Sequence, residues 1–337
     1  MANLIKANDA NELWQLARDL IESEGDASDS RVGSTKEVLQ VLFELSQPIE
    51  KWVYKRTPPI SVSFALVELM WIVSGCQDSD IIDFFNPAYK KFTADEGKDA
   101  YHGAYGRRLR ISHGVDQLER AYLTLKNNPN SRQVVMLLWD SELDTPNHDG
   151  SPRSKDIPCN ICSMLKIRNG KLDWTQVMRS NDIVLGLPYN LVQFTGLQEI
   201  IAGWLGVEVG SYNHLSDSLH LYDKYENITD VGYNNEIKTV LNSDSLSIPK
   251  DDFDKISKDI FGRMREMMTK KTPYELQRLA MLSSKYDAYN NILLIIGANA
   301  ARRYNYVPLV NKLIKECNNP IYVLLWNQWI ECQNNRN

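Results

Sequence analysis

The feature that most constrains the fold is a pair of apolar segments joined by Asn169-Gly170. Residues 161–167 and 172–178 flank this dipeptide, which two-residue β-hairpin turns prefer because both positions tolerate positive φ. Residues 134–139 form a third short apolar run of strand character. These segments predict antiparallel strands of one sheet near the middle of the chain.

Helical patterns surround this sheet. Residues 8–21 carry leucines at helical spacing after Asp9, residues 64–73 form an apolar run, and residues 191–205 repeat apolar side chains at helical intervals. From residue 251 onward the sequence is charged and rich in helix-favouring residues. We therefore expect a mixed α/β body followed by a helical C-terminal extension.

Composition excludes several classes of protein. The 337 residues are 43% hydrophobic and 24% charged with a net charge of −5, so no overall positive field predicts binding to nucleic acid. Residues 292–301, the longest apolar candidate, are too short to span a bilayer. The N-terminus does not read as a signal peptide, and five scattered cysteines favour a reducing compartment. We expect a cytoplasmic protein without a membrane segment or structural metal.

Cys159 is a candidate nucleophile at the entry to a predicted strand. A Pro-Cys dipeptide taken alone favours an ordinary buried thiol. Cys159 and Cys162 also form a CxxC, which suggests a redox or metal protein as a weaker alternative. Residues three apart on a strand point to opposite faces, which disfavours that alternative.

Three motifs give Cys159 a context. They are Pro158-Cys159-Asn160, then Arg179-Ser180-Asn181-Asp182, then Gly186-Leu187-Pro188-Tyr189-Asn190. Together they resemble the thymidylate synthase superfamily, and further matches in the same order lie at residues 29–35, 68–71, 104–106, 131–132 and 220–222. The resemblance spans about residues 29–224. It implies a large twisted mixed sheet with flanking helices, of α+β type.

The resemblance also implies a chemistry. A Cys159 thiolate, with Arg179 near it to lower its pKa, would add to C6 of a pyrimidine, so that C5 attacks a one-carbon unit from 5,10-methylenetetrahydrofolate. Asn190 would stabilise the ring carbonyl, and its amide favours uracil over cytosine. Glu68 and Tyr105 would belong to the proton relay. A carboxylate in the apolar run that holds Glu68 independently suggests either catalysis or an ion pair with a core arginine.

The remaining site residues follow from the resemblance. The catalytic set is completed by Asp182, and the nucleotide-binding set is Arg31, Arg132, Arg179, Ser180, Asn190, His220 and Tyr222. Folate would contact Tyr89, Asp182 and Gly186. In this family an arginine matching Arg132 reaches the partner subunit, so the resemblance implies a homodimer. The substrate would be a pyrimidine nucleoside monophosphate.

Four positions depart from typical thymidylate synthases. Asn160 replaces a histidine and Met178 replaces a glutamine. Gln133 replaces a second arginine, and Tyr89 replaces a tryptophan. The first two resemble the pyrimidine nucleotide hydroxymethylases, which let water attack the transferred carbon. No match to the closing C-terminal tail of thymidylate synthases is recognisable. We expect 5-hydroxymethyl-dUMP as the product, with reductive methylation to dTMP, or a nucleotide-binding homologue of reduced activity, as alternatives.

These observations predict three parts of the chain: an N-terminal helix in residues 1–28, a catalytic domain in residues 29–250 and the helical extension in residues 251–337.

Overall fold

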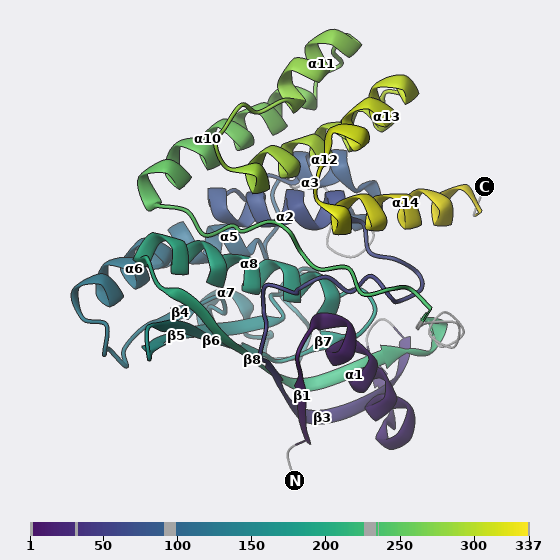
Figure 1. Cartoon of the computed structure of the whole chain (residues 1–337). Helices are drawn as coiled ribbons and strands as arrows, with labels where there is room; N and C mark the ends of the chain where they lie inside the picture. Colours follow the sequence, from purple (N-terminus) through teal and green to yellow (C-terminus); the bar gives the residue numbers. More distant parts are fainter. Residues whose placement is uncertain (1–2, 31–32, 91–98, 226–233, 235, 336–337) are drawn as a thin grey trace.

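The chain is arranged in layers (Figure 1): a large mixed sheet, the helices that cover it, and the C-terminal helices. The computed structural model describes residues 3–30, 33–90, 99–225, 234 and 236–335. The sheet has eight strands in the order β1-β3-β8-β6-β5-β4, with β2 paired to β3 and β7 paired to β8. The predicted fold class is confirmed.

Strands spread over residues 3–222 join in one sheet. They are β1 (Asn3–Ala7), β2 (Asp26–Ser30), β3 (Gly33–Leu45), β4 (Val135–Leu137), β5 (Asn160–Arg168), β6 (Lys171–Met178), β7 (Asn181–Asp182) and β8 (Glu208–Tyr222). β8 lies between β3, which is antiparallel to it, and β6, which is parallel.

The predicted hairpin is confirmed. β5 and β6 pair in antiparallel register with Arg168 opposite Lys171. Asn169 and Gly170 have φ angles of 53° and 75°, the conformation that explains the Asn-Gly dipeptide. The segment predicted at residues 134–139 is only partly a strand, since β4 covers three of its six residues.

Two strand regions were missed. Residues 26–30 and 33–35 form a hairpin through β2 and the start of β3. β8 has no apolar alternation because its inward face buries the polar side chains of Tyr212, His214 and Ser216. A strand whose buried face is polar gives no hydrophobic period to detect.

The predicted helices are confirmed with shifted ends. The helices of the body are α1 (Ala10–Glu24), α2 (Val62–Ser74), α3 (Ser79–Phe85), α5 (Tyr105–Arg107), α6 (Gln117–Asn127), α7 (Ser141–Asp144) and α8 (Leu187–Leu205), with the short helices η1 (Pro87–Tyr89), η2 (Arg108–Ser112) and η3 (Asp223–Tyr225). Asp9 caps α1 by accepting from the backbone N–H groups of Asn11 and Glu12. α8 contacts both β6 and β8.

α2 is buried from Val62 to Val73. It packs on α8 on one side and on α10, α12 and α14 on others, so it lies between the sheet tier and the C-terminal tier (Figure 1). A helix enclosed in this way is apolar on every face, which explains the sequence of residues 64–73.

The C-terminal region is helical, as expected. Its helices are α10 (Lys250–Met267), α11 (Pro273–Ala280), α12 (Asp287–Arg303), α13 (Val307–Glu316) and α14 (Pro320–Asn334). A buried ion pair between Lys51 and Glu199, 2.6 Å apart, anchors the segment that leads to them, because Glu199 also accepts from the N–H of Leu246. Among the described helices, none is both long and apolar enough to cross a bilayer.

Candidate active site

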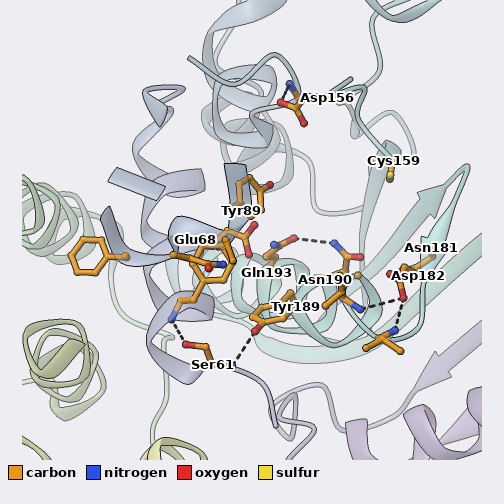
Figure 2. Close-up of a pocket in the computed structure, with 18 of the residues that line it drawn as sticks. Ser61, Glu68, Tyr89, Asp156, Cys159, Asn181, Asp182, Tyr189, Asn190 and Gln193 are labelled. Atoms are coloured by element: carbon orange, nitrogen blue, oxygen red, sulfur yellow. Dashed lines mark hydrogen bonds between the residues drawn. The ribbon is translucent and has the colours of Figure 1, made fainter. Parts of the chain in front are cut away.

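A cavity of about 830 Å³ lies where the ends of β6, β7 and β8 meet α2, α8 and the C-terminal helices. Figure 2 shows side chains from several elements facing it. The cavity brings together residues predicted from widely separated motifs: Glu68, Tyr89, Tyr105, Cys159, Ser180, Asp182, Gly186, Asn190, His220 and Tyr222.

Cys159 directly precedes β5 and is half-buried. Arg179, directly after β6, binds the segment that precedes Cys159. Its Nε donates to the carbonyl of Pro158 at 3.0 Å, and its Nη2 donates to the carbonyl of Ile157 at 3.1 Å. The same Nη2 lies 3.9 Å from the Cys159 Sγ. Burial raises the pKa of the thiol, and the positive charge of Arg179 opposes that rise. Arg179 therefore lies near the thiol, but burial has the larger effect, so the pKa of Cys159 is raised and not lowered.

Glu68 is 7% exposed on α2. Burial raises its pKa to about 7, and a hydrogen bond with the Gln193 side chain opposes the rise. One carboxylate oxygen has no hydrogen-bond partner, and no ion pair involves Glu68 in the described part of the chain. The arrangement differs from the core ion pair that was the alternative explanation for this residue.

Asn190 and Gln193 continue this chain of contacts on the first turns of α8. The Nδ2 of Asn190 donates to the Oε1 of Gln193 at 3.1 Å, as the dashed line in Figure 2 marks. The Oδ1 of Asn190 is buried and unpartnered among the described residues. A buried amide oxygen without a donor is costly, so this position suits a ligand N–H.

Asn160 lies beneath the cysteine. Its Oδ1 accepts from the Nε2 of Gln176 at 2.8 Å, while the Oε1 of Gln176 accepts from the Oγ of Ser163 and the Nε1 of Trp174. Tyr105, the first residue of α5, is close enough for the Cys159 charge to add to burial in raising its pKa. An amide network thus occupies the position at which the sequence departs from the family pattern.

Asp182 and His220 face each other across β7 and β8. The Oδ1 of Asp182 accepts from the N–H groups of Val184 and Leu185 at 2.6 and 3.2 Å. Burial raises the pKa of Asp182 and lowers that of His220, and each charge opposes the other shift. Gly186 is required here, since a Cβ would lie 2.8 Å from the carbonyl oxygen of Asp182.

Of the other predicted residues, one lines the cavity, one does not, and one lies outside the described residues. Tyr89 lines the cavity and packs on Phe64 and Tyr101, with ring centroids 5.6 and 5.3 Å apart. Arg132 is exposed and is not among the residues that line the cavity. Arg31 lies outside the described residues.

Several lining residues were not predicted. Arg56 is buried, donates to the carbonyl of Val184, and has a pKa lowered to about 10 by burial. Asp156 accepts from the N–H of Gly103 at 2.8 Å. Gln193 could have been found, because it follows Asn190 by three residues and such pairs share a helix face. Nothing local in the sequence distinguishes Arg56.

The fold is a large mixed sheet with flanking helices, and the cavity at the strand ends holds Cys159. The chain belongs to the thymidylate synthase family, whose sequence model matches residues 14–290. This confirms the resemblance drawn from the motifs.

Three relatives refine the comparison. A deoxyuridylate hydroxymethyltransferase of Bacillus phage SP01 is 36% identical over 222 residues, covering 62% of this chain and 56% of the relative. One of Pseudomonas phage M6 is 30% identical, covering 66% and 63%. A protein of Methanothermobacter marburgensis, provisionally named a thymidylate synthase, is 31% identical, covering 66% and 94%. The chain thus matches less than two thirds of either phage relative's length.

Proposed function

We propose that the chain transfers a one-carbon unit to C5 of dUMP through a covalent adduct between Cys159 and C6, giving 5-hydroxymethyl-dUMP. The observation that carries the proposal is one cavity that holds the thiol of Cys159 beside Arg179 and, facing it, the linked side chains of Glu68, Gln193 and Asn190. The two phage relatives named deoxyuridylate hydroxymethyltransferase support the same product.

The residues act in sequence on the base. The Cys159 thiolate forms a bond to C6, and the electron pair of the C5–C6 bond moves toward the O4 carbonyl. Asn190, through its Oδ1, accepts from N3–H and fixes the ring. Glu68 is half-ionised near pH 7 because its pKa is about 7, so it can hold and release a proton at O4 through Gln193 or ordered water.

The donor is 5,10-methylenetetrahydrofolate, which supplies an electrophilic carbon at the oxidation level of formaldehyde. The cavity fits its flat ring, since Tyr89, Phe64 and Tyr101 form an aromatic cluster at the wall. Asp182 and Gly186 border the same space. Once C5 has bonded to the transferred carbon, loss of the C5 proton would break the bond from that carbon to the folate nitrogen and release tetrahydrofolate. Water would then add to the exocyclic methylene left on C5, and the Cys159–C6 bond would break to restore the C5–C6 double bond. The oxidation level of the carbon is unchanged.

Phosphate and sugar contacts fall to residues at the strand ends. Ser180, His220 and Tyr222 line the cavity beside Cys159. Arg179 is committed to two backbone carbonyls through Nε and Nη2, which leaves its remaining donors for phosphate. Arg31 and Arg132 are proposed as further phosphate contacts.

We infer a homodimer in which Arg132 reaches the partner's site. Leu39, Val135 and Leu137 are exposed hydrophobic residues on β3 and β4, next in sequence to the buried Val38 and Met136. Because neighbouring strand residues point to opposite faces, these side chains lie on the face opposite the helices, at two places separated by β8, β6 and β5. Arg132 is exposed just before β4. Sedimentation at micromolar concentration, and mixing of R132A with C159A subunits to restore activity, test this inference.

The deciding experiment is mass spectrometry of dUMP incubated with the protein and 5,10-methylenetetrahydrofolate, with dCMP, UMP and CMP run in parallel. A hydroxymethyl increment with tetrahydrofolate released is the expected result. A methyl increment with dihydrofolate released would make the protein a thymidylate synthase, the alternative that the archaeal relative favours. No increment, and no covalent adduct of 5-fluoro-dUMP at Cys159, would leave a nucleotide-binding homologue.

A further inference from the structure

The C-terminal helices contribute one wall of the cavity that contains Cys159. Arg302 and Arg303 at the end of α12, and Trp329 and Gln333 on α14, line it together with residues at the ends of β6, β7 and β8. Both helices contact α2, which bears Glu68, as Figure 1 shows. All four side chains lie beyond residue 290, where the family match ends, so family membership assigns them no role.

The wall carries concentrated positive charge. Arg302 is half-buried, with its guanidinium carbon 4.6 Å from the centre of the Trp329 ring. Burial, and then the neighbouring charge of Arg303, lower the pKa of Arg302. Arg303 is exposed and lies over Phe84 at 5.7 Å. Two adjacent guanidinium groups repel each other, and the aromatic rings beneath them leave their polar edges free.

Neither arginine has a partner that explains this placement. In the described residues, no carboxylate forms an ion pair with Arg302 or Arg303, and the buried Nε of Arg302 has no hydrogen-bond acceptor. A buried donor without an acceptor is costly, and the guanidinium fork is the donor that carboxylates and phosphates bind in bidentate geometry. The arrangement therefore fits an anion that enters the cavity with a ligand.

We propose that Arg302 and Arg303 bind the carboxylates at the glutamate end of the one-carbon donor, so that the C-terminal helices form part of the donor site. This inference rests on the proposed function. The aromatic cluster of Tyr89, Phe64 and Tyr101 lines the same cavity. A flat ring held there, with its reactive carbon toward Cys159, extends its acidic tail toward α12.

The nucleotide phosphate is the other anion that could enter this cavity. Of its proposed contacts, Ser180 lies in the connection after β6, and His220 and Tyr222 lie on β8. In Figure 2, Cys159 lies on the side opposite Glu68 and Tyr89, and it is α2 that α12 and α14 contact. Geometry thus assigns the arginine pair to the donor end, and the experiment below separates the two anions.

The test compares R302Q/R303Q with wild type and with R278Q, an exposed arginine of α11 in the same helical tier. Dissociation constants are measured with dUMP bound for tetrahydrofolate, its tetraglutamate form, and tetrahydropteroate, which lacks the glutamate. We expect the double variant to weaken tetrahydrofolate by about tenfold or more and tetrahydropteroate by less than about twofold. R278Q should match wild type with every probe.

A charge-conserving variant, R302K/R303K, guards against a folding defect. It should bind tetrahydrofolate more tightly than R302Q/R303Q but less tightly than wild type, because lysine keeps the charge and loses the bidentate donors. The dissociation constant of dUMP alone should be unchanged in every variant, which also reports correct folding.

Three outcomes would overturn the inference. Equal losses with tetrahydrofolate and tetrahydropteroate would mean that the arginines act on the shape of the cavity. A loss of dUMP affinity would assign the pair to the nucleotide phosphate. If R302Q/R303Q binds tetrahydrofolate as tightly as wild type does, and wild type transfers carbon to dUMP, this inference is wrong and the proposed function is retained. If wild type binds none of the three folate probes, the proposed function falls with it.

Discussion

The two walls of the cavity are built differently. On the cysteine side, Cys159 and Arg179 are connected by backbone contacts between adjacent strands: the N–H of Arg179 donates to the carbonyl of Cys159 at 2.9 Å, and its side chain donates to two further carbonyls of the same loop. On the opposite side, Arg302 and Trp329 come from two helices and meet through packing alone.

This difference between the two walls explains why the residues of one could be predicted from the sequence and those of the other could not. Strand neighbours place short motifs in fixed register, so a motif such as Arg179-Ser180-Asn181-Asp182 specifies positions as well as residue types. Helix packing leaves the approach of two side chains to the angle and depth of the contact. The cysteine side is therefore predicted to govern reaction at the base, and the helical side to govern affinity for the donor.

The largest expected effect is loss of the nucleophile. C159S should lower turnover of dUMP by about 10⁴-fold or more, because a neutral hydroxyl cannot replace a thiolate in forming the C6 adduct. C162S, three residues along β5 and also free, is the matched control and should retain turnover within about twofold. Steady-state assays and mass spectrometry of a 5-fluoro-dUMP adduct check both. Comparable losses in the two variants would contradict a special role for Cys159.

Glu68 should make the protein less stable as pH rises. Its folded pKa of about 7 lies above the ordinary value of 4.5, so the native state binds more protons than the unfolded state between these values and stability falls with rising pH. E68Q removes that dependence. Relative to wild type it should gain stability on the order of 2 to 3 kcal/mol between about pH 5 and about pH 8.

Urea unfolding of both proteins at the two pH values measures this difference. E68Q is expected to lose turnover and to gain stability relative to wild type at high pH. A variant that lost turnover because it folded poorly would instead be less stable than wild type. A free-energy difference that does not change with pH would mean that Glu68 ionises as it does in water.

Much of the cysteine side could be predicted from sequence. The motifs around Cys159, Asp182 and Asn190 were enough to place all three in one cavity, and Asn169-Gly170 located the hairpin between them. His220 was identified only by resemblance, since β8 buries polar side chains and has no apolar period.

The opposite wall could not be predicted. Arg302 is separated from Cys159 by more than a hundred residues, and its charge is indistinguishable in sequence from that of any helix-terminal arginine, the type that favours a helix C-terminus. Arg56 is similar, because its burial depends on contacts with Trp14 and Val184 far along the chain. Only the assembled tiers show that these side chains share a cavity.

Gln193 offers a sharper test of the cysteine side. Its hydrogen bond lowers the pKa of Glu68, and its Oε1 holds the amide of Asn190. Q193L should lower kcat by about tenfold and move the acidic limb of the kcat/KM profile to higher pH, since the carboxylate loses a donor. The same substitution at Gln277 of α11 should change neither quantity. An unshifted limb in Q193L would disconnect Gln193 from Glu68.

The smallest expected effect lies on the helical wall and asks whether packing there sets donor affinity. Trp329 holds Arg302 by a cation–π contact at 4.6 Å, an interaction worth about 1 kcal/mol at a partly exposed site. W329A should therefore weaken tetrahydrofolate by about threefold to fivefold without changing kcat, whereas W329F keeps an aromatic face and should recover most of the loss. Equal weakening of tetrahydropteroate would place Trp329 against the ring of the donor instead of beneath Arg302. A fall in kcat would show that the two walls are not separable, because a side chain of the helical tier would then influence the reaction at Cys159.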